Sequence, residues 1–129
     1  MDKWQALQAF WESFGLPAFK ENSVPDEVWD ENLKKMVKLQ MPYITYEVTA
    51  STFGTRVASS ASIWYRDTSW KAISNKAKTI TDATADGKTF AYDGGGMIVW
   101  TNNASDMSEP TDDMVRRIRL DVTIEFIGG

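Results

Sequence analysis

The stretches PYITY at residues 42–46 and SIWYRDTSWK at residues 62–71 decide the fold of this chain. Apolar and polar residues alternate around both of them, which indicates half-buried strands over 43–50 and 56–66. Phe53-Gly54-Thr55 marks a turn between these strands, so the pair is predicted to form an antiparallel hairpin. Apolar residues then recur at helical steps to about Ala83, with Asp67 or Thr68 as the cap. Two strands that lead into an amphipathic helix are the skeleton of a small α+β domain.

Two further helices are predicted before these strands. Residues 2–14 carry apolar residues at three- and four-residue steps, and Gly15 and Pro17 follow as stop signals. The apolar stripe consists of Trp4, Leu7, Phe10 or Trp11, and Phe14. A shorter helix is predicted near 26–38, where the spacing is partly helical and Ser23 with Asp26 resembles a capping box.

The second half of the chain is predicted to be mainly β-structure. Short strands over 89–92 and 97–101 flank Asp93 and Gly94–Gly96, which read as a slack hairpin turn. Residues 102–113 are polar and predict a mobile loop. Residues 115–127 alternate strictly, and their length predicts a strand that crosses the sheet centre. We therefore expect one α+β domain over residues 1–129, with a mostly antiparallel or mixed sheet packed by two or three helices.

Composition narrows the function classes. The chain has 129 residues, a net charge of −4, no cysteine and no histidine. The acidic balance (pI about 4.8) argues against a protein that grips nucleic acid through phosphate contacts. Without cysteine the chain has no disulfides and no thiolate nucleophile. Without histidine it lacks the commonest metal ligand and the commonest general base near neutral pH. Neither a signal peptide nor a membrane-spanning stretch is apparent, so we expect a protein that acts or assembles in the cytoplasm without membrane contact.

Every candidate motif for catalysis, a cofactor or a metal lacks residues or surroundings that its chemistry requires. Asp82 to Gly87, with Asp93 as a twelfth residue, imitates a calcium loop but lacks the proper third and twelfth ligands. Gly94–Gly96 lacks the lysine and the helix of a phosphate loop. The carboxylate pairs Asp112/Asp113 and Asp26/Glu27 lie in polar segments, where solvated charge is the expected state. We predict no cofactor, no metal and no enzymatic activity.

Two tryptophans remain as possible stacking residues. Trp64 and Trp100 fall on the polar face of their predicted strands, where they can stack on a sugar or a base. Burial or a protein contact is the favoured interpretation for both.

Taken in order, several of these elements resemble the tail-terminator (tail-completion) proteins of long-tailed bacteriophages. The shared marks are the first helix, Val24-Pro25, the PYITY strand, Trp64 with Ser69-Trp70, the glycine-rich hairpin and the closing strand. The resemblance covers most of the chain. The segment from Asp26 to Gln40 departs from it, because it is longer than the family's usual run between the "VP" and "PY" elements.

The resemblance implies a homohexameric ring in the phage neck. Such a ring sits on the last ring of the tail tube, ends polymerisation and offers the docking surface for the head connector. The implied partners are other copies of the chain, the tail tube protein and the connector or stopper protein, while DNA passes through without specific binding. The implied location is the virion, after assembly in the host cytoplasm.

Candidate interface residues follow from the flexible polar segments. They are Gly94, Gly95, Gly96, Asp112, Asp113 and Arg116. The alternatives are another connector or stopper protein of the neck, or a cytoplasmic tryptophan-rich ligand-binding module.

Overall fold

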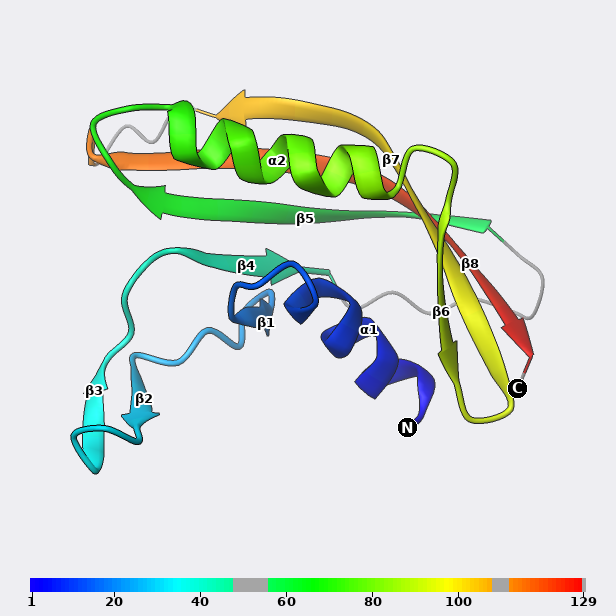
Figure 1. Cartoon of the computed structure of the whole chain (residues 1–129), viewed down its shortest axis with the longest axis horizontal. Helices are drawn as coiled ribbons and strands as arrows, with labels where there is room; N and C mark the ends of the chain where they lie inside the picture. The colour runs from blue at the N-terminus through cyan, green and yellow to red at the C-terminus, as the bar shows by residue number, and fades with distance from the viewer. Residues whose placement is uncertain (48–55, 108–111, 129) are drawn as a thin grey trace.

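The computed structural model describes residues 1–47, 56–107 and 112–128. Within these ranges the chain forms two helices and eight strands (Figure 1). In chain order they are α1 (Lys3–Glu12), β1 (Ala18–Lys20), β2 (Glu27–Asp30), β3 (Lys35–Lys38), β4 (Tyr43–Tyr46), β5 (Arg56–Arg66), α2 (Lys71–Ala83), β6 (Lys88–Tyr92), β7 (Gly95–Met107) and β8 (Val115–Gly128). The predicted turn at 53–55 and the predicted strand residues 48–50 lie outside the described residues.

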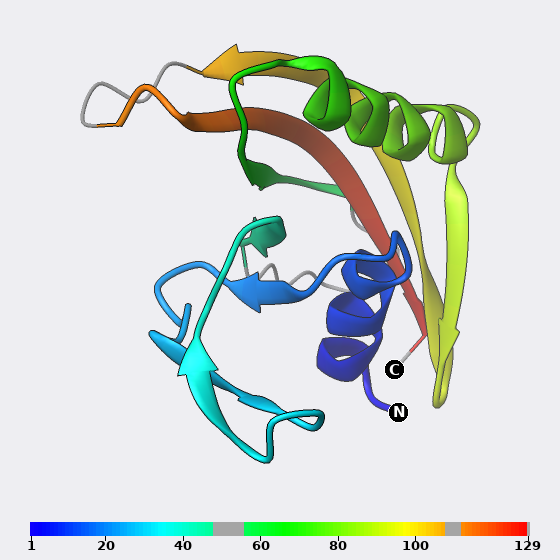
Figure 2. The same ribbon diagram turned by 60° about the vertical axis from the view of Figure 1, so that its left-hand side comes forward.

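Six strands form one curled sheet in the order β1-β4-β5-β8-β7-β6 (Figure 2). β1 runs parallel to β4, and every other neighbouring pair is antiparallel. β8 pairs along most of its length with β5 on one side and β7 on the other. The α+β class with a mixed sheet is confirmed, and so are the β4–β5 pairing and the central place of the C-terminal strand.

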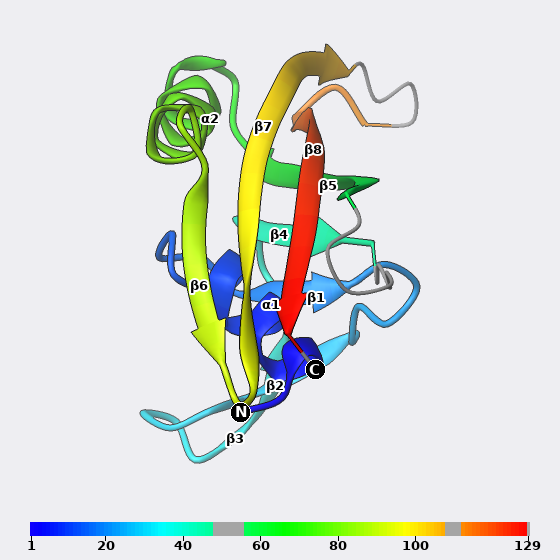
Figure 3. The same ribbon diagram turned by 90° about the vertical axis from the view of Figure 1, so that its right-hand side faces the viewer.

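Both helices pack on the same face of this sheet. The even-numbered residues of β8 point to that face and are almost fully buried: Ile118, Leu120, Val122, Ile124 and Phe126. Ile73 and Ile80 of α2 and Phe10 of α1 join them in one hydrophobic cluster. Burying a side chain of this size contributes about 1.5–3 kcal/mol. The odd-numbered residues of β8 lie on the other face, which no described helix covers (Figure 3).

The helix starts differ in how well the sequence predicted them. Asp2 caps α1 in a capping box with Gln5, as its position suggests. α2 begins later than predicted, because Asp67 accepts the Ser69 N–H in a turn and the Ser69 hydroxyl accepts the Lys71 N–H. The residue that precedes the helix is Trp70, whose side chain makes no capping hydrogen bond.

The predicted helix over 26–38 is wrong, because this segment is the hairpin β2–β3. The Asp30 side chain accepts the N–H groups of Asn32 and Leu33, and the Lys34 N–H returns to the Asp30 carbonyl at 2.8 Å. Asp30 therefore folds a tight turn and competes with helical hydrogen bonds. Opposite charges then face each other across the strands, with Glu27 beside Lys38 and Asp30 beside Lys35.

The predicted loop over 102–113 is also wrong in its first half. β7 continues to Met107 after a register shift between Thr101 and Asn103, and its residues from Asn103 onward pair with β8. Such a bulge lets a strand bend and resume pairing. Residues 108–111 of the predicted loop lie outside the described residues. No helix among the described residues is long and apolar enough to cross a membrane.

The hairpin between β6 and β7 is tighter than predicted. Only Asp93 and Gly94 form its turn, while Gly95 and Gly96 belong to β7 and pair with β8 as well. Gly94 has a positive φ of 81°, a conformation that glycine adopts without strain. At Gly95 the limit is space, because a Cβ atom there would lie 2.0 Å from the Ile127 carbonyl oxygen.

These neighbouring glycines give a matched pair of variants. Gly95→Ala forces the β7 and β8 backbones apart, and we expect a loss of about 1–3 kcal/mol in the free energy of unfolding. Gly96→Ala meets its nearest atom, the Phe90 carbonyl oxygen, at an ordinary 3.4 Å, so we expect a change within about 0.5 kcal/mol. Urea unfolding of both variants checks this, and equal losses would contradict the close approach at Gly95.

Candidate interaction surfaces

The predicted interface residues Gly94–Gly96 lie at the end of the sheet where α1 begins. The Asp93 N–H donates to the Met1 carbonyl at 2.8 Å, and the Asp93 carboxylate lies 2.6 Å from the Met1 amino group. β8 holds the other side of this hairpin through the pairs Gly95–Gly128 and Gly96–Ile127. The turn is therefore held by neighbours on both sides rather than slack.

Asp112 lies at the start of β8 and is held in place by two donors. Its carboxylate accepts the Met114 N–H at 2.9 Å and an Arg66 guanidinium N–H at 2.5 Å. The hydrogen bond from Met114, followed by that from Arg66, lowers the pKa of Asp112 below its ordinary value. These contacts join the start of β8 to the end of β5.

Arg116 makes hydrogen bonds and a cation–π contact within the chain. It donates to the carbonyls of Asp113 and Thr68, the latter at 3.1 Å, and its guanidinium lies 5.4 Å from the Trp70 ring centroid. These contacts fasten the beginning of α2 to β8. Asp113 contributes its carbonyl to this arrangement, while its exposed side chain has no ion pair among the described residues.

The structure thus places the six predicted interface residues in two separate regions. β8 has Asp112, Asp113 and Arg116 near its first residue and Gly94–Gly96 beside its last. At a rise of about 3.3 Å per residue, a strand of this length spans roughly 40 Å. The two groups do not form one site, and their part in an interface stays a prediction.

The most exposed apolar surface is one the sequence reasoning missed, on the hairpin β2–β3. Trp29 and Met36 face each other across the two strands, and Leu33 lies in the turn. Their exposed fractions are 52%, 51% and 59%. The hairpin projects from the body of the molecule, away from the six-stranded sheet (Figure 1). We call the side with Trp29, Leu33 and Met36 the hairpin face.

A second apolar surface lies on α1. Trp4 belongs to the predicted buried stripe, but it is 37% exposed, because the buried face of α1 is centred on Ala6, Leu7, Phe10 and Trp11. Trp4 forms part of a shallow groove of about 320 Å³. The lining residues are Trp4, Gln5, Gln8, Ala9, Glu12 and Lys20, and we call this feature the α1 groove.

The uncovered face of the sheet is polar and largely paired within itself. Arg117 lies over Trp64 at 4.8 Å and Arg56 over Trp100 at 4.7 Å, measured to the ring centroids. The Trp64 indole N–H donates to the Thr45 hydroxyl at 2.9 Å. Cation–π contacts of this kind stabilise a solvated sheet face. Both tryptophans therefore have structural partners, which favours burial over stacking on a sugar or a base.

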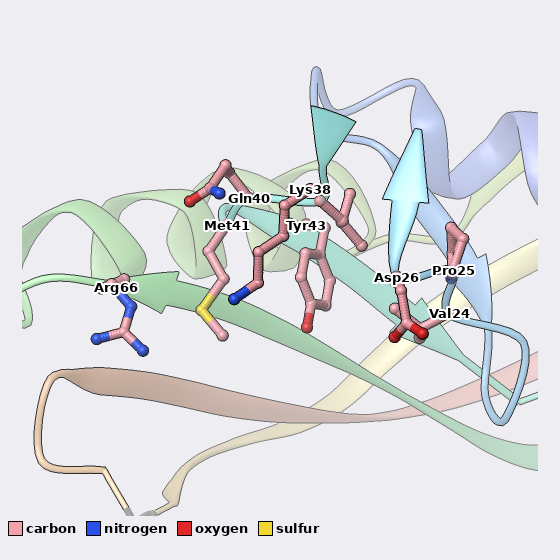
Figure 4. A pocket seen from close by; sticks show the side chains of 9 residues that line it. Val24, Pro25, Asp26, Lys38, Gln40, Met41, Tyr43 and Arg66 are labelled. Carbon is pink, nitrogen blue, oxygen red and sulfur yellow. The ribbon is translucent and has the colours of Figure 1, made fainter. Parts of the chain in front are cut away.

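A pocket of about 400 Å³ lies at the root of the hairpin (Figure 4). Tyr43, Met41 and Lys38 point into the same space as Asp26, with Arg66 at one side. The full lining is Val24, Pro25, Asp26, Lys38, Leu39, Gln40, Met41, Tyr43 and Arg66. Burial raises the pKa of the Tyr43 hydroxyl above its ordinary value. The volume lies within the range of small-molecule sites, but the lining is mixed and charged.

Two carboxylates of the segment that imitates a calcium loop, from Asp82 to Asp93, are paired with cationic groups of the chain. Asp82 pairs with Lys78 one turn earlier on α2 at 2.8 Å, and Asp93 contacts Met1. Within the part of the chain that the structure describes, no three His, Cys, Asp or Glu side chains gather as a metal-binding group.

No protein-family model matches the chain, and no curated protein matches it. Its function is therefore inferred from its own residues and surfaces.

The contacts of Asp112 predict a pH dependence. A carboxyl group with a lowered pKa in the folded state stabilises the fold above its unfolded pKa of about 3.9, and this contribution is lost as the pH falls through the folded value. We expect Asp112→Asn to unfold at lower urea concentration than the wild type at pH 7, and the difference to shrink below about pH 4. Asp113→Asn is the control, and we expect it to leave the midpoint unchanged. An Asp112→Asn difference that persists undiminished at pH 2 would contradict the assignment.

Proposed function

We propose that this protein is a structural subunit that assembles into a homo-oligomeric ring, caps the tail tube of a long-tailed bacteriophage and forms the head–tail joining surface. The observation that carries the proposal is the pair of exposed apolar surfaces, the hairpin face and the α1 groove, on a domain whose core is otherwise closed. Exposed apolar patches on soluble domains mark contacts with other molecules.

Two different surfaces on one chain suit a ring. When a patch on one subunit contacts a different patch on the next, the contact repeats head to tail and closes into a ring if the rotation permits. A two-stranded hairpin standing alone is marginally stable in water. Contact with a neighbour would stabilise β2–β3, which pairs with no other strand among the described residues.

The phage-specific part of the proposal is supported by the order of sequence motifs, from the first helix through PYITY to the closing strand. The segment that departs from the family pattern, 26–40, contains the projecting hairpin. The net charge of −4 suits a ring through which DNA slides without sticking. The same features suit a connector or stopper ring of the neck. The two roles differ in where the ring binds, because only the cap sits directly on the tail tube.

The pocket at the hairpin root favours one candidate from another class, a monomeric ligand-binding module. Its volume of about 400 Å³ and the aromatic ring of Tyr43 are the observations in its favour. Such a module binds a small molecule without forming rings.

Mass photometry with negative-stain imaging, over a range of protein and magnesium concentrations, tests the proposal. We expect six-fold rings, and we expect added protein to stop the growth of tubes formed by the tail tube protein of the same phage. A protein that stays monomeric at every concentration and leaves tube growth unchanged would overturn the ring-forming role. Rings that leave tube growth unchanged would instead favour the connector or stopper role.

A further inference from the structure

The geometry points to a specific subunit contact: the hairpin face of one copy of this chain docks into the α1 groove of the next copy. This inference rests on the proposed ring-forming function and names the surfaces that build the ring. The occupant of each surface is therefore a second copy of the same chain.

The hairpin supplies a preformed apolar knob. Trp29 and Met36 are register partners, so their side chains share one face, while Val28 and Val37 on the other face are half-buried. The Asp30 side chain holds the turn through two backbone N–H groups, which fixes where Leu33 is displayed. Tryptophan and methionine are enriched at the centres of protein interfaces.

The α1 groove supplies a fixed receptor. Gln8 donates to the Ala18 carbonyl at 2.6 Å and to the Glu12 carboxylate at 2.8 Å, and it accepts the Tyr46 hydroxyl. These bonds lock the Gln8 side chain between α1, β1 and β4. Trp4 adds an exposed aromatic surface to the same groove.

Charges around the two surfaces complement each other. Glu27 and Lys38 are cross-strand partners on the side of the hairpin that carries Trp29 and Met36. Glu12 and Lys20 line the α1 groove. Within the described residues none of these four side chains is in an ion pair. Docking that brings Lys38 to Glu12 and Glu27 to Lys20 fixes the orientation of the knob.

The contact joins unlike surfaces, which distinguishes it from a two-fold dimer. Residues of the hairpin meet residues of α1, so each subunit uses one surface toward each neighbour. In a hairpin-to-hairpin dimer, the hairpin faces of both partners would be occupied and both α1 grooves would stay empty.

Two complementary variants test this arrangement. Trp29→Ala with Met36→Ser removes the knob, and Ala9→Arg places a long charged side chain in the groove. We expect each variant alone to lose rings, with at least a tenfold higher protein concentration needed for any association. Mixed together, the two variants retain one intact knob and one intact groove, so we expect 1:1 heterodimers and no rings. Met114→Ser is the matched control, because Met114 is also exposed but belongs neither to the hairpin face nor to the α1 groove, and it should form rings as the wild type does.

Crosslinking provides a second readout, which measures proximity directly. Because the chain contains no cysteine, Leu33→Cys and Lys20→Cys each carry a single thiol. A bismaleimide should join these two variants when they are mixed, and Leu33→Cys mixed with Met114→Cys should stay uncrosslinked. Circular dichroism of every variant checks that it is folded.

The outcomes separate this inference from the proposed function. Rings that persist in the knob or groove variants, or a mixture without heterodimers, would overturn the contact and leave the ring-forming role intact. A wild type that stays monomeric, together with no crosslink between Leu33→Cys and Lys20→Cys, would overturn the contact, and the effect of the wild type on tube growth would then decide the proposed function separately.

Discussion

The strand β8 is the constraint on which the rest of the structure depends. It hydrogen-bonds to β5 and β7 at the same time, and its even-numbered side chains belong to the hydrophobic cluster that also contains the buried residues of both helices. Because side chains alternate along a strand, a shift of one residue would send Ile118 to Phe126 into water and bring the charged residues inward. The register of β8 thereby fixes which face of β5 and β7 is buried.

The one-sided packing of the helices has a structural consequence. No described helix covers the other sheet face, which carries polar residues and arginines that lie over Trp64 and Trp100. An antiparallel sheet accepts such a solvated face. The apolar residues that do reach the surface therefore stand out. They concentrate on β2–β3 and at the start of α1, and these two elements carry the proposed interaction surfaces.

Several candidate interface residues were predicted to lie in flexible segments, but hydrogen bonds and close backbone contacts hold them in the fold. Arg116 ties β8 to the beginning of α2, and Asp112, for which solvated charge was the expected state, ties the start of β8 to the end of β5. Gly95 is required by the close approach of the Ile127 carbonyl and does not provide slack. Polar residues and glycines between elements are thus held in place by the fold, and their part in an interface stays a prediction. The exposure of Trp29 follows from its place in the β2–β3 hairpin, where Met36 is its strand partner.

By itself the sequence determined the elements whose periodicity is strong. The alternation over 115–127 and 56–66 and the helical stripe after Trp70 predicted β8, β5 and α2, because each pattern suits only one backbone conformation. Tertiary structure decided the segments with weak local signals. Residues 103–107 are polar, yet they form a strand because β8 offers unpaired backbone groups beside them. Residues 27–38 form a hairpin because the Asp30 turn brings opposite charges together across the strands. Trp4 is exposed because α1 buries the face that carries Ala6, Leu7, Phe10 and Trp11. Both candidate surfaces belong to this second group, since exposure depends on what the whole chain leaves uncovered.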